Sequence, residues 1–411
     1  MATHQWFPDY TGGSARVATE TARALARRGH ELVVLAPHGR RPAGESERAL
    51  RVDRVLPRGP FPRTLTDVLW TTGHARRFDR SSFDVLVAHH PTTAIGLVGA
   101  GLDAPLVFVY HASVVRELEM LVATLPSRRG RLATRAIGLA LAKLERGTVA
   151  RAARVVTLSD YSRSLVTTDH RSASARVCVA PGGIDPESFA PASERLTVRR
   201  SLGLDGEGPL ILGVRRLEPC LGLETLLEAA SLLRLPRAPT VALAGGGSLA
   251  PKLSRLGAQL GLGGRLRLLG TPTPESLRAV YAAADVFVMS PAPREGFGLA
   301  TLEALASGTP AVGAPVGATP ELLEPLEPRL VATESSAPAL AEAIEHTLEH
   351  ADPSFRRRCH EYAVNRYGWD RVAERWEQVL ADATERRPRA GVTKPGPAGR
   401  CVIQGPQGSV R

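Results

Sequence analysis

The chain alternates short apolar runs with longer segments in which apolar residues recur every three or four positions. The runs are four or five residues long and lie at 32–35, 85–88, 106–109, 155–158, 210–214, 241–244, 265–269 and 286–289. Such unbroken apolar runs are typical of strands that are buried on both faces, as in parallel sheets. The segments between them have helical periodicity, so we expect helices on both faces of the sheets and an α/β fold.

This alternation occurs twice, before and after a segment at 181–208 that is rich in proline and glycine. A chain of 411 residues is too long for one ordinary core, whereas two domains of this type fit it well. We therefore expect a first domain at 1–183, a linker at 184–208 and a second domain at 209–366. Residues 385–411 are basic and rich in proline and glycine, and are predicted to form a disordered tail.

The candidate chemistry begins with the string EGFGLATLEALASGTP at residues 295–310. It follows the strand at 286–289 and predicts a turn and then a helix that starts near Phe297 or Gly298. Free N–H groups at a helix start attract phosphate and hydroxyl oxygens, and the two carboxylates eight residues apart, Glu295 and Glu303, flank that start. Two glutamates at this spacing are also common on solvated helices, so the spacing alone assigns nothing.

The complete string resembles the signature of the retaining glycosyltransferases of family 4, which have the GT-B fold. The segments at 6–35, 159–189, 212–217 and 244–249 are also similar to parts of that family, so only the tail lies clearly outside the resemblance. The resemblance implies two Rossmann-like, doubly wound domains that face each other across a cleft. It also implies that the last helix, at 367–384, crosses back onto the first domain.

The same resemblance implies an enzyme, a hexosyltransferase that takes its sugar from a UDP- or GDP-linked donor and retains the anomeric configuration. The acceptor would be a glycan or a lipid-linked molecule, in the synthesis of cell-surface polysaccharide or glycolipid. In that family the residue at Glu303 binds the ribose hydroxyls. Glu295 holds the donor sugar together with the backbone amides of three following residues: Phe297, Gly298 and Leu299.

Further positions match donor-side residues of the family. Arg216 corresponds to the arginine that grips the phosphates, and a guanidinium can hold two phosphate oxygens at once. His111 follows a buried strand, so it is expected at the carboxyl edge of the sheet, where the family places a histidine beside the donor sugar. Gly12 and Gly13 lie at the start of the first helix and would let that helix approach the diphosphate or the acceptor, although glycines in a loop are otherwise just turn formers. His89 and His90, after another strand, are weaker candidates on the acceptor side.

We expect no metal ion and no cofactor other than the nucleotide sugar. A leaving diphosphate is stabilised either by a metal on an Asp-x-Asp motif or by basic side chains and helix dipoles. No two aspartates in this chain are separated by one residue. The four cysteines are scattered and lack the spacing of a zinc site: Cys178, Cys220, Cys359 and Cys401.

Two departures from the family pattern support a rival interpretation. Leu221 stands where the family has a second phosphate-binding lysine, and only Arg215 is near enough in sequence to replace it. Most of the first strand is also missing before His4, which suggests a start site assigned too late or an impaired domain. The rival is a catalytically lapsed relative that binds nucleotide or glycan as a partner subunit, and the intact 295–303 string opposes it. A dinucleotide-dependent oxidoreductase is weaker still, because no G-x-G-x-x-G follows a strand.

The net charge of +11 is concentrated in two segments. The tail at 385–411 carries +5, and residues 127–154 carry +7 on a segment with helical spacing of leucine and isoleucine. The second segment fits either a basic helix on an anionic membrane or an arginine-rich solvated face. We find no nucleic-acid-binding motif to accompany the charge. No signal peptide or spanning segment is recognisable, so a cytoplasmic protein is expected, with the inner membrane face as the site of any attachment.

Overall fold

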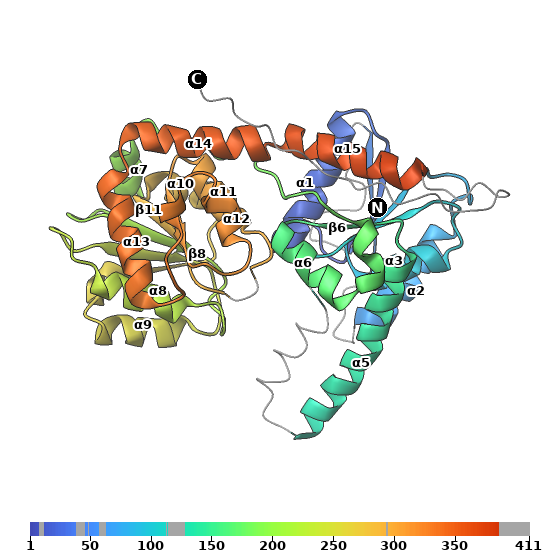
Figure 1. The fold of residues 1–411 in the computed structure, drawn as a ribbon, viewed down its shortest axis with the longest axis horizontal. Helices are drawn as coiled ribbons and strands as arrows, with labels where there is room; N and C mark the ends of the chain where they lie inside the picture. The colour runs from blue at the N-terminus through green and yellow to red at the C-terminus, as the bar shows by residue number, and fades with distance from the viewer. Residues whose placement is uncertain are drawn as a thin grey trace.

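The computed structural model describes residues 1–7, 12–37, 46–47, 49–56, 63–111, 113, 128–292 and 295–385. Two α/β units lie side by side, and two consecutive helices, α14 (Pro353–Tyr367) and α15 (Trp369–Glu385), run along one edge of both units (Figure 1). The predicted tail lies outside the described residues beyond Glu385. Within the described part of the chain, no helix is both long enough and apolar enough to cross a bilayer.

The first unit contains two groups of strands. In the first group the order is β1-β3-β2, with β1 at Leu32–Pro37, β2 at Ser46–Glu47 and β3 at Leu50–Leu56. In the second group the order is β4-β5-β6-β7, with β4 at Leu86–Ala88, β5 at Leu106–Val109, β6 at Arg154–Thr157 and β7 at Val177–Val179. All pairs are parallel except β2 with β3.

Residues 1–3 join these two groups into one sheet. Ala2 forms parallel bridges to Leu35 of β1 and to Ala88 of β4. The Ala2 N–H donates to the Val87 carbonyl at 2.8 Å, and the Leu35 N–H donates to the Met1 carbonyl at 2.8 Å. These three residues therefore occupy the central strand position that the sequence led us to expect as largely missing, and they pair backbone groups of β1 and β4 there.

Side chains of neighbouring strand residues in this sheet point to opposite faces. Val87, Val107 and Val156 pack with residues of α1 (Gly13–Arg27) and α15. Leu86, Leu106 and Val155 pack on the other face with residues of four helices: α2 (Arg63–Ala75), α3 (Pro91–Gly99), α5 (Arg128–Arg151) and α6 (Asp160–Asp169). A 3₁₀ helix, η1 (Arg171–Arg176), precedes β7.

The second unit has one sheet in which every pair is parallel. Its order is β10-β9-β8-β11-β12, with β8 at Leu210–Val214, β9 at Thr240–Ala244, β10 at Leu266–Gly270, β11 at Val286–Met289 and β12 at Ala311–Gly313. Its helices are α8 (Leu223–Leu232), α9 (Ala250–Gln259), α10 (Pro274–Ala283), α11 (Leu299–Ala306), α12 (Thr319–Leu323) and α13 (Ala337–His350), with short 3₁₀ turns η2 (Gly263–Arg265) and η3 (Pro328–Leu330). The prediction of an α/β protein with parallel sheets is confirmed.

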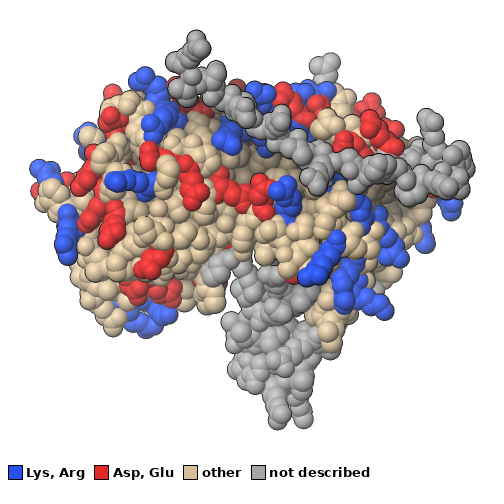
Figure 2. Space-filling view, viewed as in Figure 1, with Lys and Arg blue, Asp and Glu red and all other residues tan. Residues whose placement is uncertain are grey.

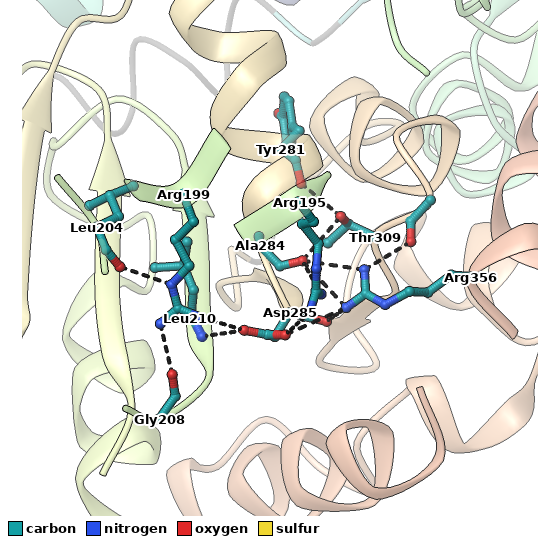
Figure 3. Close-up of polar contacts among 11 residues, drawn as sticks. Arg195, Arg199, Leu204, Gly208, Leu210, Tyr281, Ala284, Asp285, Thr309 and Arg356 are labelled. Atoms are coloured by element: carbon teal, nitrogen blue, oxygen red, sulfur yellow. Dashed lines mark hydrogen bonds and ion pairs between the residues drawn. The ribbon is translucent and has the colours of Figure 1, made fainter. Parts of the chain in front are cut away.

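The segment expected as a linker, 184–208, contains α7 (Arg195–Ser201) and contributes Ile184, Phe189 and Leu204 to the core of the second unit. Figure 3 shows how polar contacts fasten it there. The Asp285 carboxylate accepts hydrogen bonds from Arg199 at 3.0 Å and from the Leu210 N–H at 2.7 Å.

Two more arginines contact Asp285, which immediately precedes β11. Arg195 forms an ion pair with Asp285 at 2.8 Å, and Arg356 of α14 donates to the Asp285 carbonyl at 2.8 Å (Figure 3). Burial lowers the pKa of Arg356 to about 10, with Arg195 as the second cause. The network holds α7 and α14 at the amino ends of β8 and β11. The carboxyl ends of β8 and β11, where α/β proteins bind ligands, take no part in this network.

Helix α15 is fastened to the first unit by apolar and charged contacts. Trp376 is fully buried and packs in the same cluster as Val107 and Val156. Arg28, just after α1, binds Glu377 through two nitrogens at 2.8 Å each. Arg154 is also buried and pairs with Asp382 at 2.9 Å, so this member of the basic segment faces α15 and not a membrane.

Candidate functional site

Helix α11 and the loop that precedes it carry five of the predicted donor residues, of which Leu299 and Glu303 lie in the helix itself. β11 ends at Met289, and α11 starts after Gly298, which has a left-handed φ of 95° that glycine adopts without strain. No side chain caps the start of α11. Its first N–H groups therefore lack the side-chain partner that Ser, Thr or Asp supplies in other helices of this chain. The predicted start near Phe297 or Gly298 agrees with the observed helix to within two residues.

The start of α1 in the first unit lies against the start of α11. Gly12 precedes α1, and no side chain caps that helix either. A Cβ added at Gly13 would lie 3.6 Å from Leu299 Cδ1, and one added at Gly182 would lie 2.9 Å from Leu299 Cδ2. The positive ends of two helix dipoles thus meet at the junction of the units.

His111, which follows β5, lies close to the loop that precedes α11. Its carbonyl oxygen lies 3.4 Å from the position that a Cβ on Gly296 would take. Two serines of the first unit hold that glycine: Ser159 Oγ and Ser162 Oγ donate to the Gly296 carbonyl at 2.6 and 3.0 Å. The structure therefore brings His111 next to the loop that contains Glu295 and Phe297. This role of the serines is not among those predicted from the sequence, and their S-x-x-S spacing at the start of α6 is the only local signal of it.

His111 belongs to a cluster of histidines in which His89 is buried and His4, His90 and His111 are half-buried. His89 Nδ1 and His111 Nε2 are 3.0 Å apart, and the rings of His4 and His90 are 4.2 Å apart between centroids. Burial lowers the pKa of His111 to about 4, with His90 as the second cause, and burial lowers the pKa of His90 to about 4. The pKa of His89 is also well below its ordinary value because of burial. The imidazoles of His89, His90 and His111 are therefore neutral at pH 7, and His111 can offer hydrogen bonds and dipoles but no full charge.

Glu295 forms an ion pair with Arg215, which follows β8. The same guanidinium donates to the Ser290 carbonyl at 2.9 Å. Arg215 is thus fixed on the loop that follows β11. The idea that Arg215 replaces the missing lysine is not supported, because, besides the carboxylate, its guanidinium donates to two backbone carbonyls, those of Ser290 and Leu221.

Arg216 is exposed and has no hydrogen bond or ion pair within the described part of the chain. Leu221 is half-buried, and its carbonyl accepts a hydrogen bond from Ser290 Oγ at 2.7 Å. The backbone before it is unusual, because Cys220 has a positive φ of 66°. This loop therefore offers one available cation, Arg216, where the family pattern has two.

Glu303 lies inside the junction and is only 4% exposed. It forms an ion pair with Arg16 of α1, a contact that the sequence did not predict. Burial raises the pKa of Glu303, while Arg16 and the Tyr281 hydroxyl act in the opposite direction. The carboxylate predicted to bind ribose is thus held by a cation of the other unit in this ligand-free structure.

A second carboxylate, that of Glu321, also links the two units. Glu321 of α12 accepts hydrogen bonds from the N–H groups of Asp160, at 2.7 Å, and Tyr161, so it caps α6 in the first unit. A cavity of about 300 Å³ lies beside it and is lined by Phe297 but by none of the other predicted donor residues. We therefore place the candidate site by the converging helix starts and not by this cavity.

One group of described side chains has the geometry to share a metal ion. It consists of His346, Glu349 and His350 on α13, and their donor atoms lie within 4.8 Å of one another. None of the three is a predicted donor residue. The candidate site itself offers carboxylates that are already paired with arginines, Glu295 with Arg215 and Glu303 with Arg16.

Two family models match the chain, one on each unit. Residues 11–188 match the model described as Glycosyltransferase Family 4, and residues 194–366 match the model described as Glycosyl transferases group 1. A curated relative, D-inositol 3-phosphate glycosyltransferase from Xylanimonas cellulosilytica, is 31% identical over 406 residues, which is 92% of this chain and 93% of the relative.

Solved structures confirm the arrangement of the units. Sucrose-phosphate synthase from Thermosynechococcus elongatus superposes with a TM-score of 0.75 at 20% identity and covers 94% of this chain and 99% of that one. HepE from Anabaena, solved in complex with UDP and glucose, superposes with a TM-score of 0.69 at 18% identity and covers 92% and 98%. The predicted GT-B fold is confirmed.

Proposed function

Because the chain belongs to the glycosyltransferases of group 1 and family 4, we propose that it moves a hexose from a UDP- or GDP-linked donor to an acceptor, with retention and without a metal ion. The observation that supports this most is the meeting of two uncapped helix starts with His111. A Cβ on Gly13 would contact Leu299, and a Cβ on Gly296 would contact the His111 carbonyl. Such helix starts favour a bound diphosphate between them.

In this proposal the nucleotide lies along α11. Glu303 binds the ribose hydroxyls, since it lies about 6 Å along the helix from Leu299 at roughly 1.5 Å per residue. The diphosphate lies at the first amides of α11 and near Gly13. Arg216, exposed and unpaired within the described residues, stabilises the negative charge that grows on the leaving diphosphate.

The donor sugar lies between the 295–299 loop and His111. Glu295, together with the amides of Phe297, Gly298 and Leu299, orients its hydroxyls. His111 is neutral, because its pKa is about 4, so it supports the charge at the transferred sugar through its dipole and carbonyl oxygen. The serine contacts to Gly296 fix the loop against the first unit, which keeps the sugar near His111.

We assign the acceptor to the first unit and propose a glycan or lipid-linked acceptor in cell-surface synthesis. His89 and His90 lie at the edge where such an acceptor would approach the sugar. The relative's name adds inositol phosphate as a molecule worth including in an acceptor panel.

The test is a transfer and hydrolysis assay on the full chain with a panel of UDP- and GDP-sugars, in the presence of EDTA. We expect turnover that Glu295→Ala lowers by about 10²–10³-fold, as found when a group aimed at a transition state is removed. Glu228→Ala is the matched control, because Glu228 is an exposed glutamate on α8 of the same unit. Tight nucleotide binding without turnover on any donor would instead support the lapsed relative.

We also propose that the basic helix α5 rests on an anionic membrane. Lys143, Arg146 and Arg151 are exposed on it, and Leu139 between them and the helix start is 74% exposed. Figure 2 shows a group of basic side chains on the first unit, at the lower right of the described surface. We expect the chain to sediment with phosphatidylserine vesicles at low salt and to be released by salt. Equal sedimentation with neutral vesicles would contradict electrostatic attachment.

A further inference from the structure

We propose that Arg16 is the second phosphate-binding cation of this enzyme. In this proposal, binding of the ribose to Glu303 releases Arg16 so that it can bind the diphosphate. In the ligand-free chain Arg16 is bound to Glu303. When ribose hydroxyls take that carboxylate, the released guanidinium turns to the diphosphate. This inference rests on the proposed function, since it uses the same nucleotide site.

The starting state is defined by contacts of Arg16 with both units. Its guanidinium pairs with Glu303 and lies over the rings of Phe7 and Phe189, with its central carbon 5.2 and 5.5 Å from their centroids. The Arg16 side chain is 24% exposed, whereas that of Glu303 is 6% exposed. The ion pair uses one of the two oxygens of a buried carboxylate. Ribose hydroxyls that take both oxygens, as we propose, leave the arginine without its present partner.

The need for another cation follows from the loop after β8. The family pattern has a lysine at Leu221, which is a half-buried leucine here. Arg215 is held by Glu295 and also by the carbonyls of Ser290 and Leu221, which the proposed donor sugar does not take. Arg216 alone would face a diphosphate that carries more than one negative charge, and phosphate groups are commonly bound by several charge-assisted hydrogen bonds.

The position of Arg16 suits that role. It lies in the first turn of α1, three residues after Gly13, so both are on the same face of the helix. Gly13 is the residue that meets Leu299 at the start of α11. A long guanidinium side chain that now reaches Glu303 on the second turn of α11 can rotate to a phosphate at the first turn. Arginine also matches phosphate with two parallel hydrogen bonds.

The experiment separates the phosphate contact from the ribose contact. Calorimetry on the full chain measures the affinities for UDP and UMP, and for GDP and GMP, in the unmodified chain and in Arg16→Ala. We expect the diphosphate to lose about tenfold or more in affinity while the monophosphate keeps its affinity or binds more tightly, because Glu303 is freed. Arg16→Lys should lie between, since lysine keeps the charge but loses the paired hydrogen bonds.

Arg27→Ala is the control, because Arg27 is an exposed arginine in the last turn of α1. Monophosphate binding also shows, in each sample, that the variant is folded. An unchanged ratio of diphosphate to monophosphate affinity in Arg16→Ala would overturn the inference, whether both affinities rise, fall or stay. If the unmodified chain binds neither nucleotide, the proposed function itself fails and this inference fails with it.

Discussion

His90 shows how a single half-buried side chain makes stability depend on pH. Its Nδ1 accepts the Thr92 N–H at 3.3 Å and so caps α3. Burial lowers its pKa to about 4, from an ordinary value of about 6.5. The unfolded chain therefore binds a proton at His90 more readily than the folded chain does. The stability that comes from the neutral ring is complete above about pH 6.5 and is lost as the pH falls towards 4.

We expect the free energy of unfolding to fall between pH 6.5 and 4 with contributions from His89, His90 and His111. His90→Asn should reduce that slope by up to about 1.4 kcal/mol per pH unit, since asparagine does not titrate and remains a good helix cap. Urea unfolding at several pH values measures it. His350→Asn, which changes an exposed histidine of α13, serves as the control. An identical slope in His90→Asn and the unmodified chain would contradict this account of the cluster.

Some residues of the candidate site can be predicted from the neighbouring sequence alone, whereas others depend on contacts between distant parts of the chain. Gly298 could be predicted, because a glycine after a buried strand and before an apolar helix needs only the local pattern. The Arg16–Glu303 and Arg215–Glu295 pairs could not be predicted. Arg16 and Glu303 are 287 residues apart in sequence, and their contact depends on how two separately folded units are placed. The sequence shows that Leu221 differs from the lysine of the family pattern. Whether Arg215 replaces that lysine depends on the positions of Ser290 and Glu295, which the sequence does not give.

At the scale of elements, the contact between α12 and α6 fixes one side of the junction. Ser159 caps α6 through its own Oγ and the Ser162 N–H, at 2.9 Å, while Glu321 takes the N–H groups of Asp160 and Tyr161. Burial raises the pKa of Glu321, and those two backbone hydrogen bonds oppose the rise. A carboxylate at a helix start is also favoured by the helix dipole.

Glu321→Ala should lower the free energy of unfolding by about 1–2 kcal/mol, because α6 loses its interdomain cap. It should also speed hydrogen exchange at the start of α6, which mass spectrometry can locate. Glu324→Ala provides a comparison, because Glu324 is exposed one turn further along. If exchange at α6 is the same in both variants, Glu321 does not cap that helix in solution.

Elements with strong apolar runs were predicted with small errors at their ends. β8 and β11 were predicted at their observed bounds, and the last helix, expected at 367–384, is α15 at Trp369–Glu385. β3 was not predicted, because arginine and aspartate alternate with its apolar residues and make the run discontinuous. β7 and β12 have three residues each and are too short to be distinguished from loops.

At the scale of the whole molecule, the junction combines contacts that a nucleotide would break with contacts that it would leave intact. The Arg16–Glu303 pair lies at the proposed ribose position, whereas the serine contacts to Gly296 and the Glu321 cap use groups that the proposed nucleotide does not bind. Helices α14 and α15 add a continuous connection along one edge of both units (Figure 1). The proposed nucleotide thus enters without separating the two units completely.

The central claim is that the start of α11, flanked by Glu295 and Glu303, holds a nucleoside diphosphate at the junction of the two units. A crystal structure of the chain with UDP, and another with GDP, tests it most directly. We predict the diphosphate at the first amides of α11, the ribose hydroxyls on Glu303 and no metal ion between the phosphates. A nucleotide bound elsewhere, or a junction that stays empty at saturating concentrations of both nucleotides, would contradict the account.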